Sequence, residues 1–136
     1  MRLSKIIETC NYSSNLEEMK NFYINDLGLE FVSEEKGRSV FLKAGKSMLL
    51  IFNPKNTLNN TNKLFPIHGA ITPPSIIHFA LEIQKEDYEK WKYILQDNKI
   101  YVEKEIELND SKSIYFRDPA GNLVEFITNN AWPVDN

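Results

Sequence analysis

An internal repeat constrains the fold of this chain more than any other feature of its sequence. The segment IIETCNYSSNLEEMKNFYINDLGLEFVSEE, which starts at Ile6, aligns without a gap on IIHFALEIQKEDYEKWKYILQDNKIYVEKE, which starts at Ile76. After a short shift, SVFLKAG from Ser39 aligns on SIYFRDPAG from Ser113, where the second copy carries an extra Asp118-Pro119. A chain of 136 residues that contains two copies of one unit is expected to fold as two similar modules.

Each copy is predicted to contain a strand, a helix and three further strands. The runs at residues 5–9 and 75–83 are short and rich in isoleucine, which favours strands. The segment SSNLEEMKNFYINDLG has a polar cap at Ser14 or Asn15, apolar residues at helical spacing and a stop at Gly28. Turn residues then separate three strand candidates in each copy, at Lys36-Gly37, Ala44-Gly45, Asn109-Asp110 and Ala120-Gly121.

These patterns predict a single α+β domain made of two modules. Module one covers residues 1–53, a connecting loop covers 54–74, module two covers 75–128, and a short tail covers 129–136. The loop is rich in Asn, Thr and Pro and has no sustained period. It contains His68, which is either a solvated side chain, an extra metal ligand or a general base.

The composition narrows the class of partner. A net charge of -3 gives no basic field of the kind that nucleic acid or anionic lipid selects. The single cysteine, Cys10, cannot form an internal disulfide, and the sequence has no signal-like run and no apolar stretch long enough to span a bilayer. We therefore expect a cytoplasmic protein whose partner is a small molecule or another protein, and neither nucleic acid nor a membrane.

Glu125 places a carboxylate in the middle of an apolar strand, LVEFIT. Strand alternation gives Glu8, His78 and Glu125 each a definite face, and these faces converge if the modules pack around a pseudo-twofold axis. An unpaired carboxylate inside such a fold carries a desolvation penalty of several kcal/mol. Glu125 is therefore expected to be paired, neutralised or bound to a metal.

The sequence resembles the vicinal oxygen chelate superfamily in its repeat, in the helix ending NFYINDLGLEFV and in the closing segment YFRDPAGNLVEF. This superfamily includes glyoxalase I, bleomycin resistance proteins, fosfomycin resistance enzymes and extradiol dioxygenases. The resemblance covers nearly the whole chain and implies two βαβββ modules that form a curved, cup-like mixed sheet. It also implies metal ligands on the first and last strands of each module, where this chain has Glu8, Leu50, His78 and Glu125. Glu8, His78 and Glu125 are donors suited to Mn²⁺, Mg²⁺, Fe²⁺, Ni²⁺ or Zn²⁺.

Two of the candidate roles have alternatives. The superfamily usually has His where Glu8 stands, and Glu8 can instead form an ion pair with a basic residue such as Arg117. Tyr115 and Arg117 alternate on one strand face, so both are candidate catalytic residues that contact substrate. The alternative is a core position for Tyr115 and a surface or interface charge for Arg117.

The resemblance implies a divalent-metal-dependent enzyme that acts on a small oxygen-chelating substrate as a lyase, an isomerase or a fosfomycin-type transferase. Leu50 at the fourth ligand position disfavours glyoxalase I activity, and the absence of His from ELNDSKSI disfavours extradiol ring cleavage. The alternative from another class is a non-catalytic drug-binding protein of the bleomycin-resistance type. Either way, the resemblance implies a homodimer that covers exposed apolar residues such as Trp132.

Overall fold

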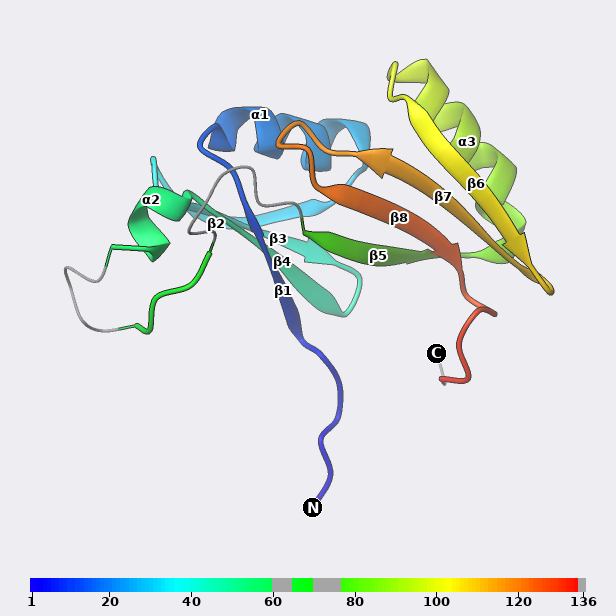
Figure 1. The fold of residues 1–136 in the computed structure, drawn as a ribbon, viewed down its shortest axis with the longest axis horizontal. Helices are drawn as coiled ribbons and strands as arrows, with labels where there is room; N and C mark the ends of the chain where they lie inside the picture. The colour runs from blue at the N-terminus through cyan, green and yellow to red at the C-terminus, as the bar shows by residue number, and fades with distance from the viewer. Residues whose placement is uncertain (60–64, 70–76, 135–136) are drawn as a thin grey trace. The chain divides into compact units, whose positions relative to one another are not determined.

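A computed structural model describes residues 1–59, 65–69 and 77–134, and the chain divides into two compact units, Met1–Ser75 and Ile76–Asn136 (Figure 1). The first unit consists of β1 (Glu8–Tyr12), α1 (Leu16–Lys20), the π-helical turn η1 (Asn21–Asp26), β2 (Glu30–Glu35), β3 (Ser39–Ala44), β4 (Ser47–Phe52) and the short helix α2 (Pro54–Thr57). The second consists of β5 (His78–Ile83), the 3-10 turn η2 (Lys85–Asp87), α3 (Tyr88–Asp97), β6 (Val102–Leu108), β7 (Ser111–Arg117) and β8 (Leu123–Thr128). The predicted strand-helix-three-strand order is therefore confirmed in both units, whereas the division into a single domain with the predicted boundaries stays a prediction.

The two sheets have the same topology. The strand orders are β1-β4-β3-β2 and β5-β8-β7-β6, and in each sheet the first strand pairs in parallel with the last. Glu8 pairs with Met48 in β4, and His78 pairs with Leu123 in β8 in the same way. Leu50 lies two residues after Met48, and Glu125 lies two residues after Leu123, so they occupy equivalent positions. The register thus confirms that Glu8 and Leu50 are the structural counterparts of His78 and Glu125.

The repeat alignment is off by one residue in the second strand of each unit. Phe31 pairs with Leu42 in β3, and the counterpart of Leu42 in β7 is Phe116, which pairs with Val102. Val102 is therefore the equivalent of Phe31, although the gapless alignment places Tyr101 there. The offset already exists where the two helices end, because the residues with positive φ there are Gly28 and Lys99, whereas the gapless alignment places Asn98 opposite Gly28.

The first strand begins later than predicted. Ile6 and Ile7 precede β1 and are 83% and 55% exposed, because the parallel pairing with β4 starts only at Glu8 and Met48. Ile76, the predicted counterpart of Ile6, lies outside the described residues. Of the predicted loop 54–74, the structure describes residues 54–59 and 65–69, and α2 occupies its start.

The first helix begins where the sequence predicts. Asn15 is the N-cap, and its side-chain oxygen accepts a hydrogen bond from the backbone N–H of Glu18 at 3.1 Å. Gly28 ends the helical region with φ +80, a conformation that suits glycine. Between them, η1 widens the helix, which then buries Tyr23 so that its hydroxyl accepts a hydrogen bond from Asn11 of β1.

Each sheet has one face packed against its own helix, where the core lies. In the second unit, Trp91 of α3 contacts Phe126 of β8 with ring centroids 4.9 Å apart, and in the first Asn11 faces Tyr23. The buried helix-side positions of the sheets are apolar: Val40, Leu42, Leu49, Ile51, Ile114, Phe116, Val124 and Phe126. Because side chains alternate along a strand, Glu8, His78 and Glu125 lie on the opposite face of their sheets, called here the helix-free face.

Two further observations concern the surface of the chain. Trp132, in the tail, is 70% exposed, so its indole is not packed on the body of the unit. None of the helices in the described ranges has the length and apolar character needed to cross a bilayer.

Candidate functional site

His78 and Glu125 lie together on the helix-free face of the second sheet. His78 is the first residue of β5, and Glu125 lies in the middle of β8, the parallel neighbour of β5. His78 Nε2 is 3.3 Å from Glu125 Oε1. The structure therefore brings together two of the three ligands predicted from the sequence.

The other ring nitrogen of His78 fixes the position of its proton. Nδ1 lies 3.0 Å from the backbone carbonyl oxygen of Leu123, and because a carbonyl can only accept a hydrogen bond, Nδ1 must carry the proton. In the neutral ring, Nε2 then presents a lone pair to a carboxylate oxygen. Two acceptors at this distance repel each other, so a cation, either a proton or a metal ion, is needed between them.

Ser113 orients the carboxylate. Its hydroxyl, on β7, donates a hydrogen bond to Glu125 Oε2 at 2.7 Å, while Oε1 faces His78. Glu125 is only 7% exposed, and a buried carboxylate needs more compensation than the neutral hydroxyl groups of Ser113 and Tyr115 supply. A ligand carboxylate held by a hydroxyl and a ligand imidazole held by a backbone carbonyl are the usual outer contacts of a metal centre. The donor pair thus fits a divalent ion.

Tyr115 lies beside this pair on β7. Its ring stacks against that of His78, with centroids 6.2 Å apart and an interplanar angle of 28°. Burial, followed by the negative charge of Glu125, raises the pKa of the Tyr115 phenol above its ordinary value. Tyr115 is therefore a neutral hydrogen-bond donor at the edge of the pair, as a substrate contact would require.

Arg117, also on β7, is held by the neighbouring edge strand. Its Nε and Nη2 each donate to a carboxylate oxygen of Glu103 at 3.1 Å, and Nη1 donates to the carbonyl of Gly121 at 3.3 Å. This two-point pair compensates the guanidinium charge within the second unit. The role of Arg117 as a substrate contact stays a prediction.

Glu8 lies in the first unit, exposed at the start of β1. Cys10 follows it on the same face, where burial and then the charge of Glu8 raise the pKa of the Cys10 thiol. Within residues 1–59, 65–69 and 77–134, no three His, Cys, Asp or Glu side chains are grouped as a metal cluster. The role of Glu8 as a metal ligand therefore stays a prediction.

Two partners of this site were not identified from the sequence. Ser113 lies two residues before Tyr115, so one more step of the alternation that grouped Tyr115 with Arg117 would have included it. The carbonyl of Leu123 had no such signal, because any residue supplies the same backbone group.

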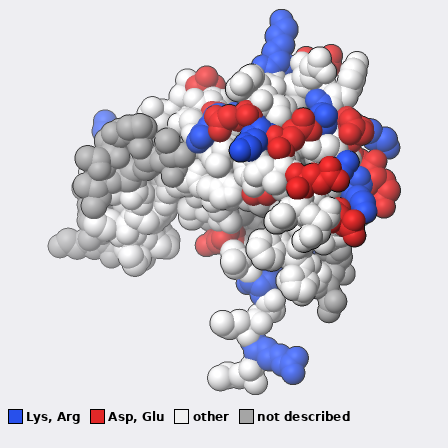
Figure 2. All heavy atoms as spheres, turned by 45° about the vertical axis from the view of Figure 1, so that its right-hand side comes forward, with Lys and Arg blue, Asp and Glu red and all other residues white. Residues whose placement is uncertain are grey.

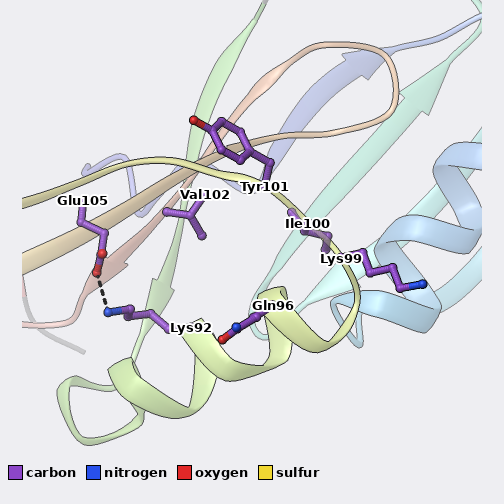
Figure 3. A pocket seen from close by; sticks show the side chains of 7 residues that line it. All are labelled: Lys92, Gln96, Lys99, Ile100, Tyr101, Val102 and Glu105. Carbon is purple, nitrogen blue, oxygen red and sulfur yellow. Dashed lines mark ion pairs between the residues drawn. The ribbon is translucent and has the colours of Figure 1, made fainter.

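The second unit also has an open cavity of about 470 Å³ between α3 and β6 (Figure 3). Glu105 at its rim pairs with Lys92 at 3.1 Å and accepts a hydrogen bond from Tyr88 at 2.6 Å, so this cavity lies on the helix side of the sheet. It is separate from the His78–Glu125 pair. Its lining residues are Lys92, Gln96, Lys99, Ile100, Tyr101, Val102 and Glu105.

Charged side chains of opposite sign are interleaved on the surface. Figure 2 shows acidic and basic groups side by side on the face that it presents. Ion pairs such as Lys90 with Asp87 at 3.3 Å and Arg117 with Glu103 at 3.1 Å belong to this pattern. The described part of this face therefore has no continuous basic patch of the kind that a polyanion selects.

Comparison with known proteins gives a consistent family and two kinds of relative. A family model described as the glyoxalase/bleomycin resistance protein/dioxygenase superfamily matches residues 5–126. The chain is 25% identical over 130 residues to metallothiol transferase FosB of Staphylococcus epidermidis, covering 94% of this chain and 84% of that protein. It is 28% identical over 127 residues to FosB of Staphylococcus haemolyticus, covering 91% and 84%.

Solved structures show the same fold. A crystal structure of lactoylglutathione lyase from Agrobacterium tumefaciens has a TM-score of 0.90 and 34% identity, over 98% of this chain and 100% of that one. The fosfomycin resistance protein FosX from Mesorhizobium loti has a TM-score of 0.66 and 16% identity, over 96% of each chain, which is a likeness of fold alone.

Proposed function

The chain belongs to the glyoxalase/bleomycin resistance protein/dioxygenase superfamily, and from this premise we propose that it is a divalent-metal-dependent enzyme. Its ligands would be His78, Glu125 and Glu8. The observation that carries the proposal is the pair of facing acceptors, His78 Nε2 and Glu125 Oε1, 3.3 Å apart. The metal-dependent relatives named metallothiol transferase support it.

The chain's own residues would prepare the site. Ser113 holds one oxygen of Glu125, and the carbonyl of Leu123 holds the protonated nitrogen of His78, so both ligands are oriented before an ion arrives. A bound divalent ion would polarise a substrate oxygen and stabilise negative charge on it. Tyr115, a neutral donor beside His78, would donate a hydrogen bond to the same substrate.

The reaction we favour is transfer of a thiol to a small electrophile with a chelating oxygen. The names of the relatives, metallothiol transferase and lactoylglutathione lyase, both refer to a thiol or a thiol conjugate. Glyoxalase I type lyases use four protein ligands in this superfamily, and the fourth position here is Leu50, a buried apolar residue. Three protein ligands leave more positions for substrate, which favours transfer over the lyase reaction.

The lyase reaction is the second candidate, because the lactoylglutathione lyase structure is 34% identical to this chain. The two reactions differ in their products. A thiol transferase joins glutathione to a small epoxide and forms a thioether. A lactoylglutathione lyase, run from glutathione and a 2-oxoaldehyde, forms a thioester. Mass spectrometry of glutathione incubated separately with a small epoxide and with a 2-oxoaldehyde would distinguish them.

Metal content tests the proposal itself. Protein purified without chelators is expected to retain close to one divalent ion per chain, and His78→Ala and Glu125→Ala are expected to lose it. Glu82→Ala is the matched control, because it removes another carboxylate from the same face of the same sheet. Glu82 lies in β5 two residues after Ala80, which pairs with Glu125. An ion retained by both ligand variants contradicts the proposed centre, and tight ligand binding by metal-free wild type favours the non-catalytic drug-binding alternative.

We also propose that the chain forms a homodimer. Both edge strands β2 and β6 carry exposed apolar side chains, including Phe31, Val32 and Leu108, and Trp132 is exposed as well. Edge strands of this kind are normally covered by a partner. Light scattering at tens of micromolar should give twice the mass of one chain, and a monomer at that concentration contradicts the dimer.

A further inference from the structure

His68 lies against the helix-free face of the first sheet. Its Nδ1 is 2.6 Å from the hydroxyl of Tyr12, at the end of β1, and its backbone N–H donates to the carbonyl of Thr57 at 3.2 Å. The His68 ring also meets Phe52 of β4 edge to face, with centroids 5.0 Å apart and an interplanar angle of 83°. Contacts with the rings of Tyr12 and Phe52 and one backbone hydrogen bond thus fix His68, for which the sequence left three roles open.

The residue after His68 is adapted to this close approach. Gly69 has φ +116, which side chains rarely allow. A Cβ at this position would lie 3.0 Å from the hydroxyl of Thr57 and 3.3 Å from the ring of Tyr12. A side chain at residue 69 would therefore be strained and would force Thr57 or Tyr12 to shift.

The neighbouring rings form an aromatic wall. Phe52 lies 5.7 Å from Phe41 at 71° and 6.5 Å from Tyr12 at 32°, measured between ring centroids. All three side chains are only partly buried, so ring surface stays available to a ligand. Aromatic surface beside a few polar groups is the usual composition of a small-molecule site.

The direction of the hydrogen bond sets what His68 offers to a ligand. Burial raises the pKa of Tyr12 above its ordinary value, so the phenol keeps its proton. A phenol O–H is a stronger donor than an imidazole N–H, so Tyr12 donates and Nδ1 accepts. The proton of the neutral ring is then on Nε2, and because His68 is exposed this N–H can reach a ligand.

We propose that Tyr12, Phe52 and His68 form a binding subsite for an organic anion. Its apolar body would lie on the aromatic wall, and a carboxylate or other oxyanion would accept a hydrogen bond from Nε2–H of His68. A hydrogen bond to a charged acceptor is stronger than one to a neutral acceptor, so the subsite prefers acids over neutral molecules of the same shape. The subsite needs no metal and lies entirely within the first unit, so it stands or falls separately from the centre at His78 and Glu125.

Binding of benzoate, with benzamide as its neutral counterpart, tests the proposal by NMR on the ¹⁵N-labelled full chain. Benzoate should bind at least about fivefold more tightly than benzamide and shift the resonances of Tyr12, Phe52 and His68. His68→Phe keeps an aromatic ring and removes the donor, so it should weaken benzoate about tenfold and benzamide, a neutral acceptor, by no more than about threefold.

Two controls separate this subsite from the metal centre. His78→Ala removes the other histidine and should leave the benzoate shifts at Tyr12 and His68 in place. Long-range ¹H–¹⁵N spectra of wild type should show His68 protonated on Nε2, and Tyr12→Phe should lose that preference. Equal affinities for benzoate and benzamide, unchanged benzoate binding by His68→Phe, or a wild-type His68 protonated on Nδ1 would each overturn the proposal.

Discussion

The two units share a backbone plan but differ in chemistry on their helix-free faces. At equivalent register positions, the second unit has His78, Glu125 and Tyr115 where the first has Glu8, Leu50 and Phe41. Ser113 and its counterpart Ser39 are both buried, but only the second unit presents a carboxylate to this serine. Strand pairing therefore fixes the positions on this face, whereas the residue at each position decides whether it offers polar or apolar groups.

The helix-side faces are alike because they carry the core. The four buried positions on the two inner strands of each unit are apolar throughout, and they match in register: Val40 with Ile114, Leu42 with Phe116, Leu49 with Val124 and Ile51 with Phe126. The residues that differ in chemistry at equivalent positions, such as Leu50 and Glu125, lie on the opposite face of each sheet.

The largest expected effect tests the shared core. Phe116→Ala and Leu42→Ala each remove a side chain with no exposed surface, and each should lower the free energy of unfolding by about 3–5 kcal/mol. Urea titration followed by circular dichroism measures it. A loss below about 1 kcal/mol in one unit alone would show that the two cores are not equivalent.

Exchanging the chemistry of the two faces should have unequal effects. Leu50→Glu puts a carboxylate among apolar neighbours in the first unit and should cost about 2–4 kcal/mol at neutral pH. Glu125→Leu removes a buried carboxylate and should change the free energy of unfolding by less than about 1 kcal/mol while abolishing metal binding. Equal destabilisation by the two substitutions would contradict the difference between the faces.

Much of this comparison could be predicted from sequence. The repeat predicted both sheets. Alternation along a strand placed Glu125 and His78 on definite faces, because this pattern depends only on residues that are neighbours in the sequence. The late start of β1, the π-helical turn and the register shift in β2 depend on which backbone groups find partners. The contact between Tyr12 and His68 joins residues 56 positions apart, so no local pattern could have indicated it.

A smaller effect on the free energy of unfolding is expected for the ion pairs that join each helix to its edge strand. Lys20 pairs with Glu34 in the first unit, and Lys92 with the equivalent Glu105 in the second, where Tyr88 also donates to Glu105 at 2.6 Å. The hydrogen bond from Tyr88, and then that from Lys92, lower the pKa of Glu105 below its ordinary value.

A carboxyl group with a lowered pKa in the folded state stabilises the fold above its unfolded pKa, and this contribution is lost as the pH falls through the folded value. Tyr88→Phe should therefore lower the free energy of unfolding by about 1 kcal/mol at pH 7 and by less below about pH 4. Urea titrations at the two pH values measure the difference. A constant effect across pH would mean that Tyr88 acts through packing alone.

The smallest expected effect concerns the helix N-termini. Asn15 caps α1 with its side chain, whereas Asp87, the N-cap of α3, makes no such hydrogen bond and forms an exposed pair with Lys90. Asn15→Ala should cost about 1 kcal/mol, and Asp87→Ala less than about 0.5 kcal/mol. Thermal melts of the two variants check the order, and a larger loss for Asp87→Ala would reverse it.

The central claim is that His78, through Nε2, and Glu125, through Oε1, would hold a divalent metal ion, and ¹⁵N NMR of the His78 ring tests it most directly. On addition of Zn²⁺ to chelator-treated protein, the Nε2 resonance should move to that of a metal-bound nitrogen while Nδ1 keeps its proton, held by the carbonyl of Leu123. Glu125→Leu should abolish the change. An Nε2 resonance that does not respond to saturating Zn²⁺, or an unprotonated Nδ1 in the Zn²⁺-bound protein, would contradict the claim.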